Sequence, residues 1–313
     1  MKKSNRKVNF IKTAGIISLA LIFIVPFLSF AGNTKDIYVN AKAGSKQDGS
    51  ATYPYDTIKE ALKKAEKSSK KVEIHVSNGV YKENIEIPSK TKIFGEDKDK
   101  TIIKADDNEP AVKMNHKTEI NKITVEGGSY GVVIDDEDRA SIVKCVIKDN
   151  DKDGVKIKAA SIEDKYAASI SESEIYDNGR SGIYSEKRRL AIMDSFIHNN
   201  EGDGIDIAAG SSAWIAGNKV KENEKSGIKL TLDGSNIWTK NNTFYNNDRE
   251  GLEVNAYGGA GRIDVNKSKF YKNDRYGIVK VNRGNLNASV WNGFTIQADT
   301  IYWENKLGNI AEK

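Results

Sequence analysis

Hydrophobic and polar positions repeat in one fixed phrase from residue 145 onward. A small polar residue is followed by an apolar residue two positions later, by Asn after three more positions and by Gly after four more, with alternating apolar residues beyond. Six copies keep this spacing and a seventh is shorter. Self-similarity at a regular period is typical of a solenoid. The copies begin at Cys145, Ser173, Ser195, Asn218, Asn242, Ser268 and Thr300.

Each copy contains three short apolar stretches with a period of two residues: before the small polar residue, after it, and after the Gly. This alternation predicts short β-strands separated by turns. Three such strands cannot bury their inner faces alone, whereas stacked coils close one continuous core. We therefore predict an all-β fold, a right-handed single-stranded parallel β-helix with three short strands per coil and coils of roughly 22–31 residues.

Equivalent residues of stacked coils form columns about 4.8 Å apart. We expect the Asn column to form a ladder of amide hydrogen bonds, and the Gly column to supply backbone freedom where the chain turns into the next strand. Cys145 is the only cysteine, so no intramolecular disulfide can form, and its column makes it a small turn residue. Length varies in one turn of the coil, at residues 158–167, 186–189 and 255–261.

An amphipathic helix is predicted before the repeats. Thr57 and Glu60 have the spacing of a capping box. Ile58, Ala61, Leu62 and Ala65 then share one helical face. We expect this N-terminal capping α-helix to cover the open end of the solenoid. Residues 32–130 are thus predicted to form the N-terminal cap and early irregular coils, and residues 131–313 the regular β-helix coils.

Residues 1–31 have the composition of a secretory signal peptide. They hold five basic and no acidic residues, then an apolar stretch at 14–30, and end in Ser29-Phe30-Ala31. Cleavage after Ala31 predicts a secreted, extracellular or cell-surface protein. The alternative is an uncleaved anchor, which would be the chain's one contact with a membrane. The whole chain carries +5, so the remainder is formally neutral and gives no support for nucleic-acid binding.

The N-terminal part of the chain contains the motifs Ile37-Tyr38-Val39-Asn40, Asp48-Gly49-Ser50, Thr57-Ile58-Lys59-Glu60-Ala61, Gly79-Val80-Tyr81-Lys82-Glu83 and Ile93-Phe94-Gly95. With these motifs, residues 36–310 resemble the pectate-lyase-like superfamily of right-handed parallel β-helices. The later Asn-x-x-x-Gly-Ile-x-Ile phrases are similar to its carbohydrate-binding and sugar-hydrolase branch. The resemblance implies a polysaccharide partner without selecting an activity, because the superfamily includes lyases, hydrolases, epimerases, esterases, tailspikes and adhesins.

The resemblance implies a substrate groove over the strand that follows each Gly, where the middle residue points outward. A uronate lyase needs a base, and a cation or Ca²⁺ to neutralise the uronate carboxylate. Lys229, Asp206 and Tyr184 are the catalytic candidates, with Asp203 nearby. Lys156 and Glu253, in the same column, are candidates for ligand binding. The alternative, which we favour from the sequence, is that these charges simply pair across the sheet.

Signatures of hydrolases and epimerases are incomplete. Gly202-Asp203-Gly204-Ile205-Asp206 resembles a phrase of polygalacturonase-like hydrolases, but the next coil has Lys225-Ser226 where those enzymes have paired Asp. No Asp-Pro-His of the epimerase type occurs. If the chain is an enzyme, the sequence therefore favours a polysaccharide lyase.

Asp149, Asp151 and Asp153 match the start of a calcium loop, with oxygen ligands at alternate positions before Gly154. The twelfth position is Ala160 where such a loop has Glu, and the repeat itself explains the Gly. The sequence does not require a cofactor, and Ca²⁺ is the only cofactor for which it contains candidate ligands.

Trp214 and Trp238 are further candidates for ligand binding. They occupy the same outward position on consecutive coils, so we expect them to stack. Flat aromatic surfaces suit the apolar faces of sugar rings. The alternative is that they reflect only the preference of aromatic residues for strands.

These observations favour a protein that binds or processes extracellular polysaccharide, with binding favoured over catalysis. The alternatives are a structural or adhesive surface rod without catalysis, and a Ca²⁺-dependent uronate polysaccharide lyase. Few residues follow Asn305 to cover the last coil. An uncovered coil can pair with another chain, so self-association through the C-terminal coil is a further hypothesis.

Overall fold

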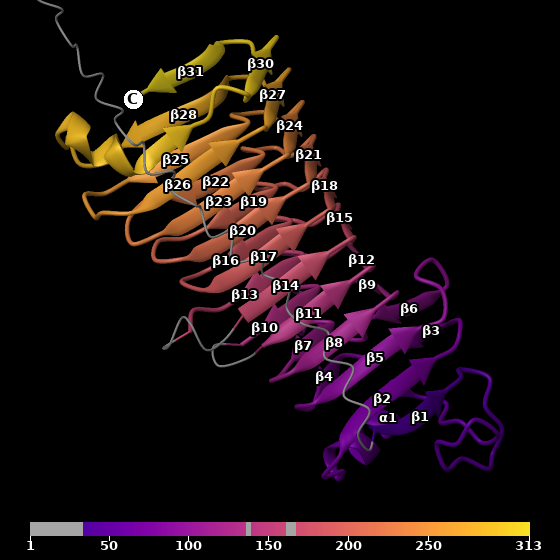
Figure 1. Cartoon of the computed structure of the whole chain (residues 1–313). Coiled ribbons are helices and arrows are strands. Elements are labelled where there is room, and N and C mark those ends of the chain that lie inside the picture. The colour runs from indigo at the N-terminus through magenta and orange to yellow at the C-terminus, as the bar shows by residue number, and fades with distance from the viewer. Residues whose placement is uncertain (1–33, 136–138, 161–166) are drawn as a thin grey trace, which may run out of the picture. The chain divides into compact units, whose positions relative to one another are not determined.

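The computed structural model describes residues 34–135, 139–160 and 167–313. The predicted signal peptide lies outside these residues, as does part of the variable turn at 158–167. Within the described ranges, no helix has the length and apolar character needed to cross a membrane. The fold class predicted from the sequence is confirmed: strands stack in three parallel sheets, and each coil contributes one strand to each sheet (Figure 1).

Sheet A has eleven strands and sheets B and C have ten each. The strands of sheet A are β1 (Thr34–Val39), β2 (Lys71–Val76), β5 (Thr91–Gly95), β8 (Thr118–Asn121), β11 (Ala140–Val143), β14 (Ala167–Ser171), β17 (Arg189–Met193), β20 (Ser212–Ala216), β23 (Asn236–Lys240), β26 (Arg262–Asn266) and β29 (Phe294–Ile296). Those of sheet B are β3 (Gly79–Lys82), β6 (Thr101–Lys104), β9 (Thr124–Glu126), β12 (Val146–Lys148), β15 (Glu174–Tyr176), β18 (Phe196–His198), β21 (Lys219–Lys221), β24 (Thr243–Tyr245), β27 (Lys269–Tyr271) and β30 (Ile301–Trp303). Those of sheet C are β4 (Ile85–Ile87), β7 (Val112–Met114), β10 (Val132–Ile134), β13 (Val155–Ile157), β16 (Ile183–Ser185), β19 (Ile205–Ile207), β22 (Ile228–Thr231), β25 (Leu252–Ala256), β28 (Tyr276–Asn282) and β31 (Gly308–Glu312).

The core is built from the inward residues of the alternating strands. In sheet A, Ile142 pairs with Ile170, Ile170 with Ile192, and Ile192 with Ile215. All four are buried, as are the equivalent inward residues of the other sheets. The sheets continue without interruption past residue 130, because β9, β8 and β7 pair directly with β12, β11 and β10. The irregular and regular coils therefore share one core.

The predicted amide ladder is present at the turn between sheets B and C. Each ladder Asn donates from its Nδ2 to the Oδ1 of the next ladder Asn, at 2.8–3.0 Å. This arrangement satisfies side-chain amides that are buried in the solenoid. The ladder runs through Asn150, Asn178, Asn200, Asn223, Asn247, Asn273 and Asn305.

Gly recurs at this position of the coil for a different reason from the one predicted. The left-handed backbone lies at the residue before each ladder Asn, such as Asn199 with φ 54° and Glu222 with φ 51°. Gly204 has no such φ, but a Cβ there would lie 2.6 Å from the carbonyl oxygen of Gly227 and 2.4 Å from Val220. The expectation of backbone freedom was therefore wrong, and Gly is needed because successive coils approach too closely for a side chain.

The N-terminal helix α1 (Ile58–Glu66) forms as predicted. Thr57 Oγ1 accepts a hydrogen bond from the Glu60 backbone N at 3.3 Å. The helix buries the predicted apolar face and contacts β1, β2 and β4. Its first turn is also capped by the buried carboxylate of Glu83, which accepts from the backbone N of Ile58 and of Lys59, both at 2.8 Å. The second cap was not predicted, because Glu83 lies 25 residues after Ile58, in the connection between β3 and β4.

The last coil is partly covered from within the chain. The 3₁₀-helix η1 (Ala288–Gly293) buries Trp291, which is 7% exposed and packs on Phe294. Trp291 Nε1 donates to Glu312 Oε1 at 2.8 Å, which ties this segment to the last strand of sheet C. Ile301 and Ile310 stay about half exposed, at 51% and 48%. Self-association through this end stays a prediction.

Asn223→Ala should lower the free energy of unfolding by about 2 kcal/mol, because it leaves buried amide partners of two neighbouring coils without their ladder contacts. Asn223 Oδ1 accepts from Asn200 Nδ2, and Asn223 Nδ2 donates to Asn247, both at 3.0 Å. Urea denaturation provides the measurement. The control is Asn236→Ala on β23, an exposed amide whose loss should cost at most about 0.5 kcal/mol. Equal losses in the two variants would contradict a structural role for the ladder.

Candidate functional site

The outward side chains of sheet C bring the five charged and aromatic candidates together. Lys156, Tyr184, Asp206, Lys229 and Glu253 lie on β13, β16, β19, β22 and β25, and we call them the sheet C strip. The strand register places each directly opposite the next. The predicted column is therefore a continuous row across five successive coils.

Each charge of the strip has a partner within the protein. Lys229 Nζ lies 3.0 Å from Asp206 Oδ2. Lys156 Nζ lies 2.7 Å from Glu186 Oε1 and 3.8 Å from the centre of the Tyr184 ring. These pairs agree with the alternative that the charges stabilise the sheet. A ligand must therefore add to these pairs or exchange with them.

The pKa of Lys229 is raised although burial lowers it, because the carboxylates of Asp206, Asp203 and Glu253 outweigh the burial. The side chain is thus an ammonium at neutral pH, suited to neutralising an anion and unsuited to accepting a proton. Burial raises the pKa of Tyr184, so its hydroxyl keeps its proton at neutral pH. Of the predicted catalytic candidates, these two can act as cation and proton donor.

Asp203, which the sequence placed only near the candidates, is the acid whose protonation changes near neutral pH. It is 5% exposed, and its Oδ1 accepts from the Ser226 backbone N at 2.9 Å. Burial and the neighbouring Asp206 raise its pKa from 3.8 to about 6, although the Ser226 N–H and Lys229 act in the opposite direction. A carboxyl group with this pKa is suited to proton transfer.

Asp203 belongs to a column of buried acids that sequence reasoning missed. Acids alternate with Ser at the residue before the Gly in five successive coils: Asp153, Ser181, Asp203, Ser226, Glu250. Asp153 Oδ1 accepts from the Ser181 backbone N at 3.1 Å, and burial raises the pKa of Asp153 as well. The signal was present in the sequence as an acid at the same place in every second coil.

Arg283 extends the strip and was not predicted. Its NH2 lies 3.2 Å from Glu253 Oε1, and its Nε donates to Asn255 Oδ1 at 2.6 Å. Asn255 Nδ2 in turn donates to Glu253 Oε1 at 2.9 Å. The three side chains hold one another, which fixes the Glu253 carboxylate at the end of the strip. Arg283 follows the last regular copy, so the repeat gave no reason to place it here.

The predicted ligand-binding residues fall on two different sheets. Trp214 and Trp238 are register partners on β20 and β23 of sheet A, and both are partly exposed. The sheet C strip therefore does not include them. Their mutual ring stacking stays a prediction.

Aromatic stacking occurs on sheet B, among outward rings of β24, β27 and β30. Tyr245 stacks on Tyr271 at 4.9 Å, and Tyr271 on Trp303 at 4.0 Å. Rings stacked in this way cover one another's faces, so they do not offer a flat row of faces to a sugar chain.

The three aspartates of the predicted calcium loop do not form a ready cage. Asp149 Oδ2 lies 2.8 Å from Lys148 Nζ, Asp151 is exposed, and Asp153 is buried with its backbone partner. Among the described residues they are not a group of three ligands within 4.8 Å of one another. Ca²⁺ binding by these three aspartates stays a prediction.

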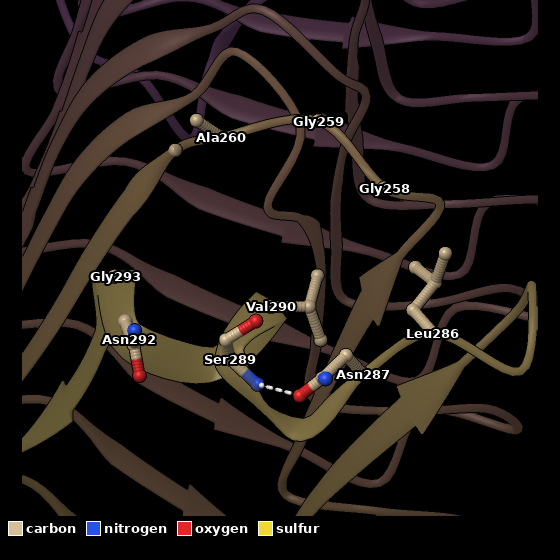
Figure 2. Close-up of a pocket in the computed structure, with 10 residues that line it drawn as sticks. Gly258, Gly259, Ala260, Leu286, Asn287, Ser289, Val290, Asn292 and Gly293 are labelled. Carbon is tan, nitrogen blue, oxygen red and sulfur yellow. Dashed lines mark hydrogen bonds between the residues drawn. The ribbon is translucent and has the colours of Figure 1, made fainter.

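Elsewhere on the described part of the surface lie three hollows. One of about 380 Å³ lies between the Gly258–Gly261 loop and the segment from Leu286 to Gly293 (Figure 2). Asn287 Oδ1 accepts there from the Ser289 backbone N at 3.1 Å. Two others, of about 480 and 370 Å³, border α1. None of these three hollows is lined by a residue of the sheet C strip.

Comparisons with known proteins agree with the fold. A family model described as right-handed beta helix region matches residues 158–294, and a pectinesterase model matches residues 43–134. An alginate lyase from Paenibacillus sp. is similar in structure, with 13% identity, a TM-score of 0.55, and coverage of 89% of this chain and 98% of the other. The A-module of the mannuronan C-5 epimerase AlgE4 from Azotobacter vinelandii has 13% identity, a TM-score of 0.51 and coverage of 88% and 96%.

The ORF18 protein of Geobacillus virus E2 is also similar, with 15% identity, a TM-score of 0.58, and coverage of 88% of this chain and 62% of the other. No curated protein matches the chain in sequence. At these identities, the likeness to solved structures shows the fold alone.

Asp203→Asn should raise the free energy of unfolding at neutral pH and leave it unchanged at acidic pH. Because the folded-state pKa of about 6 lies above the ordinary 3.8, wild-type stability falls as pH rises between these values. The Asn variant, which keeps an oxygen for the Ser226 N–H, should gain on the order of 2 kcal/mol at about pH 8 and nothing at about pH 3. Urea denaturation across this range measures the difference. A gain that does not vary with pH would show that the carboxyl group is not the cause.

Proposed function

Since the chain has the right-handed parallel β-helix fold of the pectate-lyase-like superfamily, we propose that it is a secreted or cell-surface protein that binds polysaccharide along the sheet C strip. The observation that carries this proposal is the row of five outward side chains from five successive coils. A row that repeats along the solenoid axis suits a linear polymer whose sugar units also repeat. Ammonium and guanidinium groups donate to sugar oxygens, carboxylates accept from hydroxyls, and Tyr184 adds an aromatic ring.

An acidic polysaccharide is the substrate class that we favour. An ammonium has three donor hydrogens, and Asp206 accounts for one contact of Lys229. Lys229 can therefore meet a uronate carboxylate while it keeps its ion pair. The alginate lyase and the mannuronan epimerase with the same fold support a uronate polymer, at the level of analogy. We favour binding over catalysis because the charges of the strip already have partners within the protein, as an ionic face of a stable sheet does.

A uronate lyase is the second candidate, and the pKa of Asp203 favours it. In this mechanism, the ionised Asp203 takes the proton from the carbon beside the uronate carboxylate, while Lys229 neutralises that carboxylate. The electron pair of the broken C–H bond forms the new C=C bond as the glycosidic C–O bond breaks. Tyr184 gives its proton to the leaving oxygen. Ca²⁺, if bound, would add to the neutralising charge.

Affinity electrophoresis of residues 32–313 on a panel of uronate and neutral polysaccharides tests the binding proposal. These residues lie within one compact unit. We expect at least one acidic polysaccharide to retard migration, and Lys229→Ala to weaken that affinity about tenfold, as expected for the loss of one charge-assisted hydrogen bond. Lys221→Ala is the matched control. Lys221 belongs to the same coil and pairs with Glu222 at 2.7 Å, but it lies on sheet B.

The other outcomes separate the alternatives. Relief of retardation by Trp214→Ala with no effect of Lys229→Ala would move the binding face to sheet A. Absorbance of an unsaturated product, with or without Ca²⁺ and lost in both Lys229→Ala and Asp203→Asn, would establish the lyase. If no polysaccharide retards migration and no unsaturated product absorbs, both candidates are refuted. The protein would then be a structural or adhesive rod.

A further inference from the structure

The first two strands of sheet A bring three metal-binding side chains together at the N-terminal end of the solenoid. β1 is the terminal strand of this sheet and pairs with β2. The register sets Asp36 opposite Glu73, and Tyr38 opposite His75. Outward positions alternate along a strand, so all four side chains lie on the solvent face of the sheet. Figure 1 shows both strands beside α1 at the indigo end.

The ligand atoms of Asp36, Glu73 and His75 lie within 4.8 Å of one another. His75 Nε2 is 2.9 Å from Asp36 Oδ1. Among the described residues, no other group of three or more potential metal ligands has its ligand atoms this close together. One imidazole nitrogen and two carboxylates can therefore face a common point.

The imidazole ring is held between two other rings. Tyr38 stacks on it at 5.0 Å with an interplanar angle of 23°, and Phe94 at 6.0 Å with 21°. The stack runs across three successive strands and holds the plane of the imidazole ring. Such support reduces the conformational freedom that a ligand loses on binding a metal.

The charges around the group also favour a cation. Asp36 and Glu73 face one another directly, and like charges in this relation are destabilising. Lys92 lies opposite Glu73 on the next strand, and its Nζ is 2.9 Å from Glu119 Oε2. The Lys92 ammonium thus lies beside the carboxylates of Glu73 and Glu119, and a divalent ion at the group would supply positive charge between Asp36 and Glu73.

We infer that Asp36, Glu73 and His75 bind one first-row divalent transition-metal ion. The imidazole nitrogen selects Zn²⁺ and similar ions over Ca²⁺ and Mg²⁺, which prefer oxygen ligands alone. Three protein ligands leave open positions that water fills. The ion would tie the terminal strand β1 to β2 in a chain that has no disulfide. This inference is independent of the sheet C strip and of the proposed function.

His198 provides a matched control within the same protein. It also faces outward, stacks on a tyrosine of the preceding coil (Tyr176, 4.9 Å), and has Nε2 3.1 Å from one carboxylate, that of Glu174. It lacks the second carboxylate that would complete a group of three. A site that depends on the full set should therefore respond to His75 and not to His198.

Titration of the chelator-treated protein with Zn²⁺ in a calorimeter tests the inference, with Co²⁺ as a spectroscopic probe. We expect one equivalent of Zn²⁺ to bind and to raise the temperature of unfolding. We also expect Co²⁺ to develop visible absorption. His75→Gln and Asp36→Asn should each weaken Zn²⁺ binding at least about tenfold and remove the Co²⁺ absorption, while His198→Gln keeps both.

Three results would overturn the inference: no Zn²⁺ heat, equal loss in His75→Gln and His198→Gln, or Ca²⁺ binding as tightly as Zn²⁺. Circular dichroism of each variant without metal distinguishes a lost ligand from a lost fold. If His75→Gln does not fold, Asp36→Asn alone decides the question, because Asn keeps the size of the side chain on an exposed strand.

Discussion

The buried amides at the turn between sheets B and C impose the constraint on which the rest of the structure depends. A primary amide inside the solenoid needs partners, and the nearest suitable partner is the same amide one coil away. This requirement fixes the Asn at one place in each of the seven coils that the ladder joins. The distance from the Asn to the following Gly then fixes where the sheet C strand begins and which of its residues point outward. The sheet C strip is thus a consequence of the ladder, even though none of its residues belongs to the ladder.

Most of the fold could be predicted because the period in the sequence is the period of the structure. The same period also predicted the row from Lys156 to Glu253, since equal spacing ensures that equivalent residues meet. What the sequence could not provide are contacts that do not follow the period. Arg283 reaches Glu253 from a loop beyond the regular copies, Trp291 covers the end from an insertion, and Glu83 caps a helix that precedes it.

The protonation of Asp203 also lay beyond the sequence, because it depends on burial and on the charges of two neighbouring coils. The group formed by Asp36, Glu73 and His75 was missed for a related reason. A helix separates β1 from β2, so no repeated spacing shows that these residues meet. In both cases, the three-dimensional neighbours, and not the residue types, determine the chemistry. The pairing within the strip adds a physical limit: a face of mutually neutralised charges discriminates ligands by geometry more than by long-range attraction.

The ladder and the column of small polar residues at the turn between sheets A and B together make the coil a unit of length that can be added or removed. Ser195 N donates to Asn218 Oδ1 at 3.0 Å, and Ser173 N to Ser195 Oγ at 3.2 Å, so an equivalent oxygen always lies one coil further on. If residues 195–217 were deleted as a block, the Ser173 backbone N could donate to Asn218 Oδ1. The Asn178 side chain could then donate to the Asn223 side chain. The core would close as before, while Tyr184 would become the neighbour of Lys229. Duplication or deletion of whole coils can therefore change which side chains are neighbours on the surface, while the packing of the core stays the same.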